Sequence, residues 1–191
     1  MSCIKLIVSD FDGTLVDTFR ANLEAYRVAF NEFGYELTER QYRKRFGLRF
    51  DAFMESMGIS DDVVKEKIKE TKSLVYPDYF SLLRVNNTLL SLIRSFKESG
   101  GKTALASTAR RKNLRNILTY IAASDVFDQI LAGEDVAAGK PDPEIYIKAM
   151  ERFGVAAGET LVFEDSEAGF KAAGNAGIPY IKINSMWYNE H

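Results

Sequence analysis

The most informative pattern in this sequence is a series of short apolar runs separated by amphipathic stretches. The runs are four to six residues long and carry few charges. Such runs are typical of strands that are buried on both faces of a parallel sheet. They fall at residues 4–9, 103–106, 129–132, 160–163 and 179–183. The pattern therefore predicts five strands.

Helical periodicity fills most of the intervals between these runs. The later helices are predicted at residues 87–97, 113–121, 143–153 and 166–176. The third of them has Pro143 at its start and Gly154 just past its end, a combination that marks helix termini. Strands that alternate with helices in this way indicate a doubly wound α/β fold around a parallel sheet.

The alternation stops between the first and second apolar runs. Residues 17–84 contain no strand pattern, but they show an apolar stripe over residues 23–33 and a charged helix over residues 62–72. We therefore expect a discontinuous α/β core of residues 1–16 and 85–191, and an all-helical domain of residues 17–84 inserted after the first strand.

Composition and charge exclude several classes of protein. The chain has 191 residues, a formal net charge of −2 and a sequence pI of about 5.6, so no overall positive field favours nucleic acid or a membrane surface. One cysteine, Cys3, excludes an internal disulfide, and we expect it to be buried on the first strand. No segment has the length of a membrane span. These features favour a cytoplasmic protein. The single histidine is the terminal His191, so we expect no histidine chemistry.

Pairs of acidic residues follow two of the apolar runs. The stretch IVSDFDGTLVDT places Asp10 and Asp12 at the end of the first strand, and Glu164 and Asp165 end the fourth run. Because ligands in open α/β sheets lie at the carboxyl ends of strands, we expect these acids to gather at one edge. A hard divalent ion with oxygen ligands, above all Mg²⁺, would offset their repulsion. A D-x-D-G match alone is weak, since acidic turns are common.

Two further features are predicted at the same edge. The second run ends in Ser107 and Thr108, whose hydroxyl and backbone N–H groups precede a helix and suit phosphate oxygens. Lys140 lies in the turn GKPDPE after the third run. Its ammonium would neutralise Asp10 and hold a phosphate oxygen. Taken singly, Ser107 is equally compatible with a helix N-cap, and Lys140 favours a surface lysine in a turn.

Together these motifs resemble a known family. DFDGTLVDT, ALAST, GKPDPE and FEDSEAG match, in order, the four signature motifs of the haloacid dehalogenase-like hydrolases. The resemblance covers nearly the whole chain, and the helical insertion is similar to that family's helical cap. It implies a Rossmann-like core with strand order 5-4-1-2-3, which places the first and fourth strands side by side.

The resemblance also implies a role for each motif residue. Asp10 would attack phosphorus and form an aspartyl-phosphate, and Asp12 would protonate the leaving oxygen and then activate water. Ser107, the backbone at Thr108 and Lys140 would hold the phosphoryl group. The Mg²⁺ ion would be bound by Asp10, the Asp12 carbonyl and Asp165, with Glu164 in or near its first shell. We expect Asp12, which lies among negative charges, to serve as the proton donor.

Within the family, the sequence favours a phosphatase that hydrolyses a small phosphate monoester, such as a sugar phosphate or phosphoglycolate. An aspartate at position 12 disfavours the dehalogenase and phosphonate-cleaving branches. The motif FEDSEAG, with Glu164 in place of the glycine common among phosphatases, resembles that of the branch of β-phosphoglucomutases and phosphoglycolate phosphatases. The mutases carry a histidine early in the cap, where this chain has Asn22. Asn22 and Arg49 are the candidate substrate contacts from the cap, although Arg49 is equally compatible with a surface position.

Three alternative functions are compatible with the sequence. A β-phosphoglucomutase-like phosphotransferase would interconvert sugar phosphates, and a non-catalytic module would bind a phosphorylated metabolite through the same residues. A nucleic-acid binder would use the basic stretch at residues 40–46, which an acidic chain makes a poor candidate. We expect a small phosphorylated metabolite as partner, no nucleic acid or membrane, and a monomer or homodimer.

Overall fold

The computed structural model describes residues 3–184 and Tyr188. The chain divides into two compact units. One combines the N-terminal residues through Asp17 with the chain from Arg84 onward, and the other is Thr18–Leu83. The terminal His191 lies outside the described residues.

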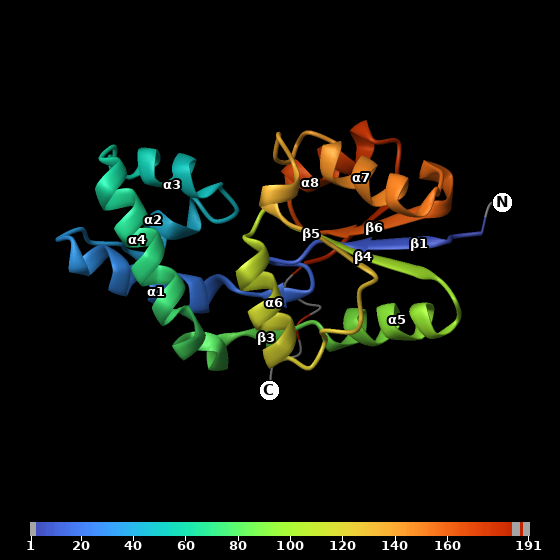
Figure 1. Ribbon diagram of the computed structural model, residues 1–191, viewed down its shortest axis with the longest axis horizontal. Helices are drawn as coiled ribbons and strands as arrows, with labels where there is room; N and C mark the ends of the chain where they lie inside the picture. The colour runs from blue at the N-terminus through green and yellow to red at the C-terminus, as the bar shows by residue number, and fades with distance from the viewer. Residues whose placement is uncertain (1–2, 185–187, 189–191) are drawn as a thin grey trace. The chain divides into compact units, whose positions relative to one another are not determined.

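The first unit is built around a parallel five-stranded sheet in the order β5-β4-β1-β6-β7 (Figure 1). The strands are β1 (Leu6–Ser9), β4 (Lys102–Ala106), β5 (Gln129–Leu131), β6 (Thr160–Glu164) and β7 (Tyr180–Lys182). Counted along the chain, these five strands have the order 5-4-1-2-3 from β7 to β5. The predicted fold class, a doubly wound Rossmann-like core, is confirmed.

Two pairs of helices cover the sheet, α5 and α6 on one face and α7 and α8 on the other (Figure 1). Their bounds are α5 (Asn87–Glu98), α6 (Arg111–Tyr120), α7 (Glu144–Phe153) and α8 (Glu167–Asn175). Short 3-10 turns are η2 (Gly133–Asp135) and η3 (Ala157–Glu159). Helix starts use local polar side chains: Asn86 accepts a hydrogen bond from the Leu89 N–H, and Ser166 accepts one from the Gly169 N–H.

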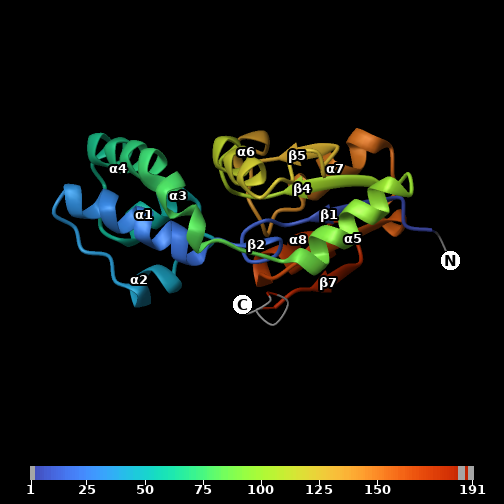
Figure 2. The same cartoon turned by 90° about the horizontal axis from the view of Figure 1, so that it is seen from below.

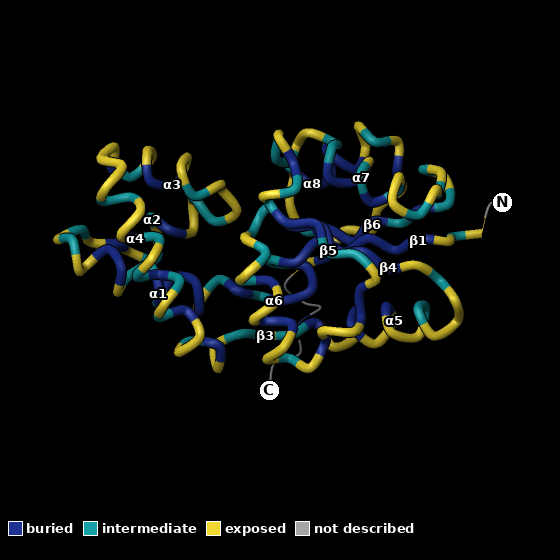
Figure 3. Tube along the Cα trace, viewed as in Figure 1, coloured by how far each residue is buried: buried dark blue, intermediate teal, exposed yellow. Residues whose placement is uncertain are grey.

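The central strands lie in the buried core, as Figure 3 shows for β1 and β4. Apolar side chains from both strands pack with residues of α7 and α8, among them Tyr146 and Ala172. β7 differs from the expected pattern, because all three of its residues are exposed. It lies at the edge of the sheet, where one side of the strand has no neighbour within the described part of the chain.

A two-stranded antiparallel ribbon, β2 (Val16–Asp17) with β3 (Arg84–Val85), was not predicted (Figure 2). Two residues are too few to produce a recognisable period in the sequence. A second prediction was wrong: Cys3 is exposed and lies before β1 rather than on it. The register of β1 with β4 and β6 begins at Leu6, and the backbone of Lys5 hydrogen-bonds to both neighbouring segments, so Cys3 lies before the first paired residue.

The second unit is entirely helical. It contains α1 (Phe19–Glu32), α2 (Glu39–Arg43), α3 (Phe50–Ser56), α4 (Asp62–Val75) and the 3-10 helix η1 (Tyr76–Leu82). Aromatic rings hold it together, and the rings of Phe30 and Phe53 stack with centroids 5.7 Å apart. Thr38 and Gln41 form a reciprocal capping box at the start of α2.

Candidate active site

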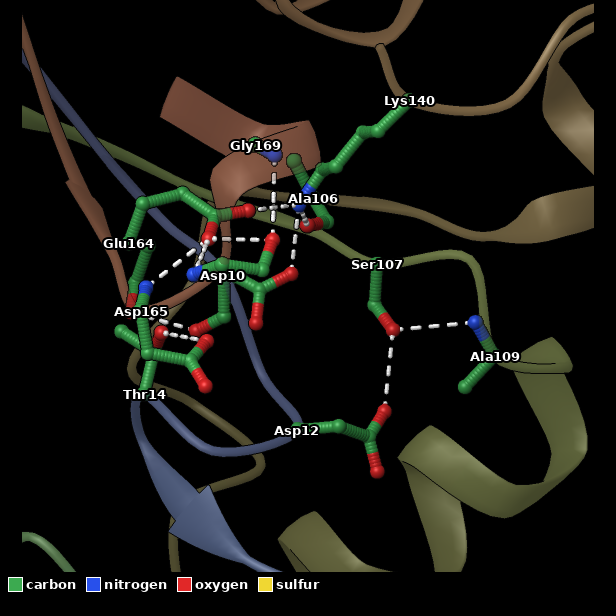
Figure 4. A network of polar contacts seen from close by, with 12 residues as sticks. Asp10, Asp12, Thr14, Ala106, Ser107, Ala109, Lys140, Glu164, Asp165 and Gly169 are labelled. Carbon is green, nitrogen blue, oxygen red and sulfur yellow. Dashed lines mark hydrogen bonds and ion pairs between the residues drawn. The ribbon is translucent and has the colours of Figure 1, made fainter. Parts of the chain in front are cut away.

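The carboxyl ends of three adjacent strands bring the candidate residues together. β1 pairs in register with β4 on one side and β6 on the other, so that Ser9 lies opposite both Leu105 and Phe163. The residues that follow these positions are therefore neighbours at one edge of the sheet. Figure 4 shows Asp10, Ser107 and Glu164 converging there, with Asp165 beside them.

Lys140 reaches this edge from the loop before α7. Its side chain is only 6% exposed, and its ammonium lies 2.5 Å from Asp10 Oδ1 and 2.6 Å from Glu164 Oε1. It also donates a hydrogen bond to the Ala106 carbonyl at 3.1 Å. A lysine ammonium has three protons, so these three acceptors use all of them. The structure thus places Lys140 beside the carboxylate of Asp10, with its charge directed into the site.

Burial and mutual repulsion shift the pKa values of this group. Burial raises the pKa of Asp10 well above its usual range, against the attraction of Lys140 and with added repulsion from Glu164 and Asp165. Burial lowers the pKa of Lys140, but the attraction of Asp10, Tyr146 and Glu164 together outweighs burial, so the pKa of Lys140 rises well above its usual value. Burial also raises the pKa of Asp165 to about 6, with Glu164 as the second cause. Lys140 is therefore a permanent cation, while the carboxylates repel one another.

Three carboxylates in the site have the geometry of a metal centre. Asp10, Glu164 and Asp165 each offer an oxygen, and these atoms all lie within 4.8 Å of one another. One ammonium does not balance three carboxylates, and a hard divalent cation is the partner that carboxylate oxygens favour. The backbone also approaches closely, because a Cβ on Gly13, whose φ is +92°, would lie 2.1 Å from Asp165 Oδ2. The donor set and this close approach fit a divalent metal ion.

Asp12 and Ser107 face each other across the site (Figure 4). The Ser107 hydroxyl donates a hydrogen bond of 3.3 Å to Asp12 Oδ2 and accepts one from the Ala109 N–H at 3.0 Å. Ser107 is buried and is not the N-cap of α6, whose cap residue is Arg110. The Thr108 carbonyl packs against Gly133, where a Cβ would lie 2.4 Å from it. The serine hydroxyl is thus held at the strand end, within reach of the second aspartate of the D-x-D pair.

Comparison with known families shows to which protein family the chain belongs. The sequence profile described as haloacid dehalogenase-like hydrolase matches residues 7–183. The chain belongs to this hydrolase family. In the described part of this haloacid dehalogenase-like hydrolase, no helix has the length and apolar character needed to cross a membrane.

Individual relatives agree with this assignment. The hydrolase is 32% identical over 184 residues to a phosphorylated carbohydrates phosphatase of Thermotoga maritima. This match covers 93% of the present chain and 84% of the relative. It is 30% identical over 200 residues to CbbY of Rhodobacter capsulatus, and this match covers 96% of the present chain and 87% of CbbY. A solved structure of a putative β-phosphoglucomutase from Thermotoga maritima matches with a TM-score of 0.73 at 31% identity. This match covers 98% of the present chain and 88% of the solved chain. The predicted family, its branch and the class of phosphoric monoester hydrolase are confirmed.

Two residues of this hydrolase's site were missed by the sequence analysis. Thr14 donates a hydrogen bond of 2.9 Å to Asp165 Oδ1 and so fixes one carboxylate of the acidic cluster. Tyr146 donates one of 3.2 Å to Glu164 Oε1. Thr14 could have been identified from the sequence, since it directly follows the D-x-D-G motif. Tyr146 could not, because an aromatic residue on an amphipathic helix reads as core.

The two candidate substrate contacts from the cap lie in the helical unit. Asn22 is a buried residue of α1, and Arg49 is the N-cap residue of α3, with extended backbone and no side-chain cap. Their contact with a substrate stays a prediction.

Proposed function

We propose that the protein is a Mg²⁺-dependent phosphatase that hydrolyses a small phosphate monoester through an aspartyl-phosphate. The observation that carries this proposal is the buried Lys140 ammonium, 2.5 Å from Asp10 Oδ1 at the edge where Asp165 also lies. A cation held against a carboxylate favours its ionised, nucleophilic form. Mg²⁺ would be held by Asp10, the Asp12 carbonyl and Asp165, with Glu164 in or near the first shell, and would supply charge neutralisation.

The residues divide the reaction between them. Asp10 attacks phosphorus, the bond from phosphorus to the ester oxygen breaks, and Asp12 gives its proton to the departing oxygen. Asp12 then takes a proton from a water molecule, whose oxygen attacks phosphorus and releases inorganic phosphate from Asp10. Ser107, the Thr108 backbone and Lys140 hold the phosphoryl oxygens. Because phosphoryl transfer has a loose transition state, positioning and charge neutralisation account for most of the acceleration.

The helical unit is the cap in this proposal, and Asn22 and Arg49 are its contacts with the leaving group. We propose a sugar phosphate or a phosphoglycolate-like ester as substrate. The support is 32% identity to a phosphatase whose name specifies phosphorylated carbohydrates. A cytoplasmic location, a monomer or homodimer, and the absence of nucleic-acid binding belong to the same proposal.

A mutase is the second candidate, favoured by the match to a putative β-phosphoglucomutase at 31% identity. A mutase returns the phosphoryl group to the sugar, so glucose 1-phosphate would be converted to another sugar phosphate with little phosphate released. The chain's single histidine is residue 191, and Asn22 stands where mutases have a histidine. This difference places the phosphatase first.

The deciding experiment is a panel of phosphate esters tested with purified protein and Mg²⁺. We expect phosphate release from several sugar phosphates, from phosphoglycolate or from both, and none when a chelator is added. Release of phosphate from glucose 1-phosphate without a second sugar phosphate would exclude the mutase. Binding of sugar phosphates with no turnover of any ester would instead establish the non-catalytic binding module.

Mg²⁺ should also stabilise the fold, most strongly above pH 6. The pKa of Asp165 is about 6 when folded, above its unfolded value, so ionising it destabilises the metal-free protein as pH rises from about 4 to 6. Bound Mg²⁺ removes that cost. At about 100 times its Kd, we expect Mg²⁺ to raise Tm by roughly 5–10 °C at pH 7.5, and by less at pH 5, where protons compete for the site. Calorimetry with wild type and Asp165→Asn tests this, and an equal gain in the variant would contradict it.

A further inference from the structure

Tyr146 lies directly against the two charged groups that flank the nucleophile. It is fully buried on α7, with its hydroxyl 3.2 Å from Glu164 Oε1. The centroid of its ring is 5.2 Å from the Lys140 Nζ atom, within range for a cation–π contact. One side chain therefore contacts both members of the Lys140–Glu164 ion pair.

The Glu164 carboxylate is held by an unusually complete set of donors. Oε2 accepts hydrogen bonds from the Asp165 N–H, the Ser166 N–H and the Ser166 hydroxyl, at 2.8, 2.8 and 3.1 Å. Oε1 accepts from Lys140 at 2.6 Å and from Tyr146 at 3.2 Å. Oε2 is thus anchored by the backbone next to it, while Oε1 depends on two side chains. The Tyr146 hydroxyl is the partner that shares Oε1 with the Lys140 ammonium.

The Lys140 ammonium is balanced between two carboxylates at nearly equal distances, 2.5 Å to Asp10 and 2.6 Å to Glu164. The balance depends on how much negative charge Oε1 presents. A hydrogen bond from the Tyr146 hydroxyl reduces that charge, and the face of its ring attracts the ammonium from a fixed direction. Without the hydroxyl, Lys140 is the remaining donor to Oε1 and is drawn toward Glu164, away from Asp10.

We propose that Tyr146 is a positioning residue, which acts through Lys140 to keep the ammonium on the nucleophile Asp10. This inference rests on the proposed phosphatase function and adds to it a residue outside the four motifs. The competing interpretation is an ordinary core tyrosine whose hydroxyl is satisfied by the nearest carboxylate. The two interpretations differ in one respect: only a positioning residue has an effect on turnover that requires Lys140.

The test is a double-mutant cycle on phosphate release at saturating Mg²⁺, with wild type, Tyr146→Phe, Lys140→Gln and the double variant. Phenylalanine keeps the ring and removes only the hydroxyl. We expect Tyr146→Phe to lower kcat about tenfold with KM within twofold of wild type. In the Lys140→Gln background, the same change should lower kcat less than twofold, because the group through which it acts is gone.

A matched control is Tyr42→Phe, which removes the hydroxyl of another buried tyrosine, in the helical unit. We expect both phenylalanine variants to lose a few degrees in Tm, and only Tyr146→Phe to lose turnover. If Lys140→Gln does not fold, Lys140→Met, which also removes the positive charge, takes its place in the cycle. A Tyr146→Phe kcat within twofold of wild type, or equal losses in both backgrounds, would overturn the inference. A wild type that hydrolyses no ester in the panel would instead overturn the proposed function.

Discussion

Replacing Asp10 by asparagine should abolish phosphate release, with kcat lower by about 10⁴-fold or more. The amide is not a nucleophile, and Glu164, the other carboxylate beside Lys140, has both of its oxygens engaged by hydrogen bonds from protein donors. The fold should survive, because asparagine has the size of aspartate, its amide oxygen can still accept a hydrogen bond from Lys140, and Lys140 keeps Glu164 as an ionic partner. A neutral isostere therefore costs the metal-free protein little. The measurements are phosphate release and Tm of the metal-free proteins.

The proposed aspartyl-phosphate on Asp10 provides a second measurement for the Asp10→Asn prediction. Acid quenching of the wild type during turnover should trap phosphate on the protein, and Asp10→Asn should trap none. Asp128→Asn is the control, because Asp128 also pairs with a lysine, at 3.0 Å from Lys97, but lies outside the site. We expect it to retain activity near that of wild type. Turnover by Asp10→Asn within tenfold of wild type would refute the assignment of the nucleophile.

The acidic edge could be predicted because parallel strands impose it. An apolar run fixes where a buried strand ends, and adjacent parallel strands end at the same edge, so Asp10 and Glu164 had to be neighbours once β1 and β6 were paired. Lys140 was harder, since it reaches the site from a loop: its place after the third apolar run indicated this edge, but a lysine in a turn is by itself typical of the surface.

The contacts that support these residues could not be read from the sequence. Tyr146 occupies a core position on α7, and nothing in a 3.6-residue period distinguishes a hydroxyl that reaches Glu164 from one that reaches solvent. The ribbon of β2 and β3 is defined by pairing between Val16 and Val85, a contact between distant segments with no local pattern. Cys3 was misplaced because its own apolar character does not show whether it lies on the strand or just before it.

Two glycines of α8 should respond to alanine in opposite ways, and Gly169→Ala should be strongly destabilising. A Cβ at Gly169 would lie 1.8 Å from Glu164 Oε1 and 1.9 Å from its Cδ. That carboxylate has no room to yield, since backbone N–H groups hold Oε2 and the Lys140 ammonium holds Oε1. Displacing it separates a buried ion pair, which costs about 3–5 kcal/mol. Urea unfolding measures the loss.

Gly174→Ala is the matched substitution one and a half turns later in the same helix. A Cβ there meets no atom within 4 Å, so alanine adds no clash. Because alanine restricts the unfolded chain more than glycine does, we expect this variant to gain about 0.5–1 kcal/mol. Comparison of the two variants separates the helix propensity of alanine from the space that Glu164 requires. If Gly169→Ala unfolds at the same urea concentration as Gly174→Ala, the Glu164 carboxylate is not fixed beside Lys140 and Gly169. That result would contradict the arrangement of the site.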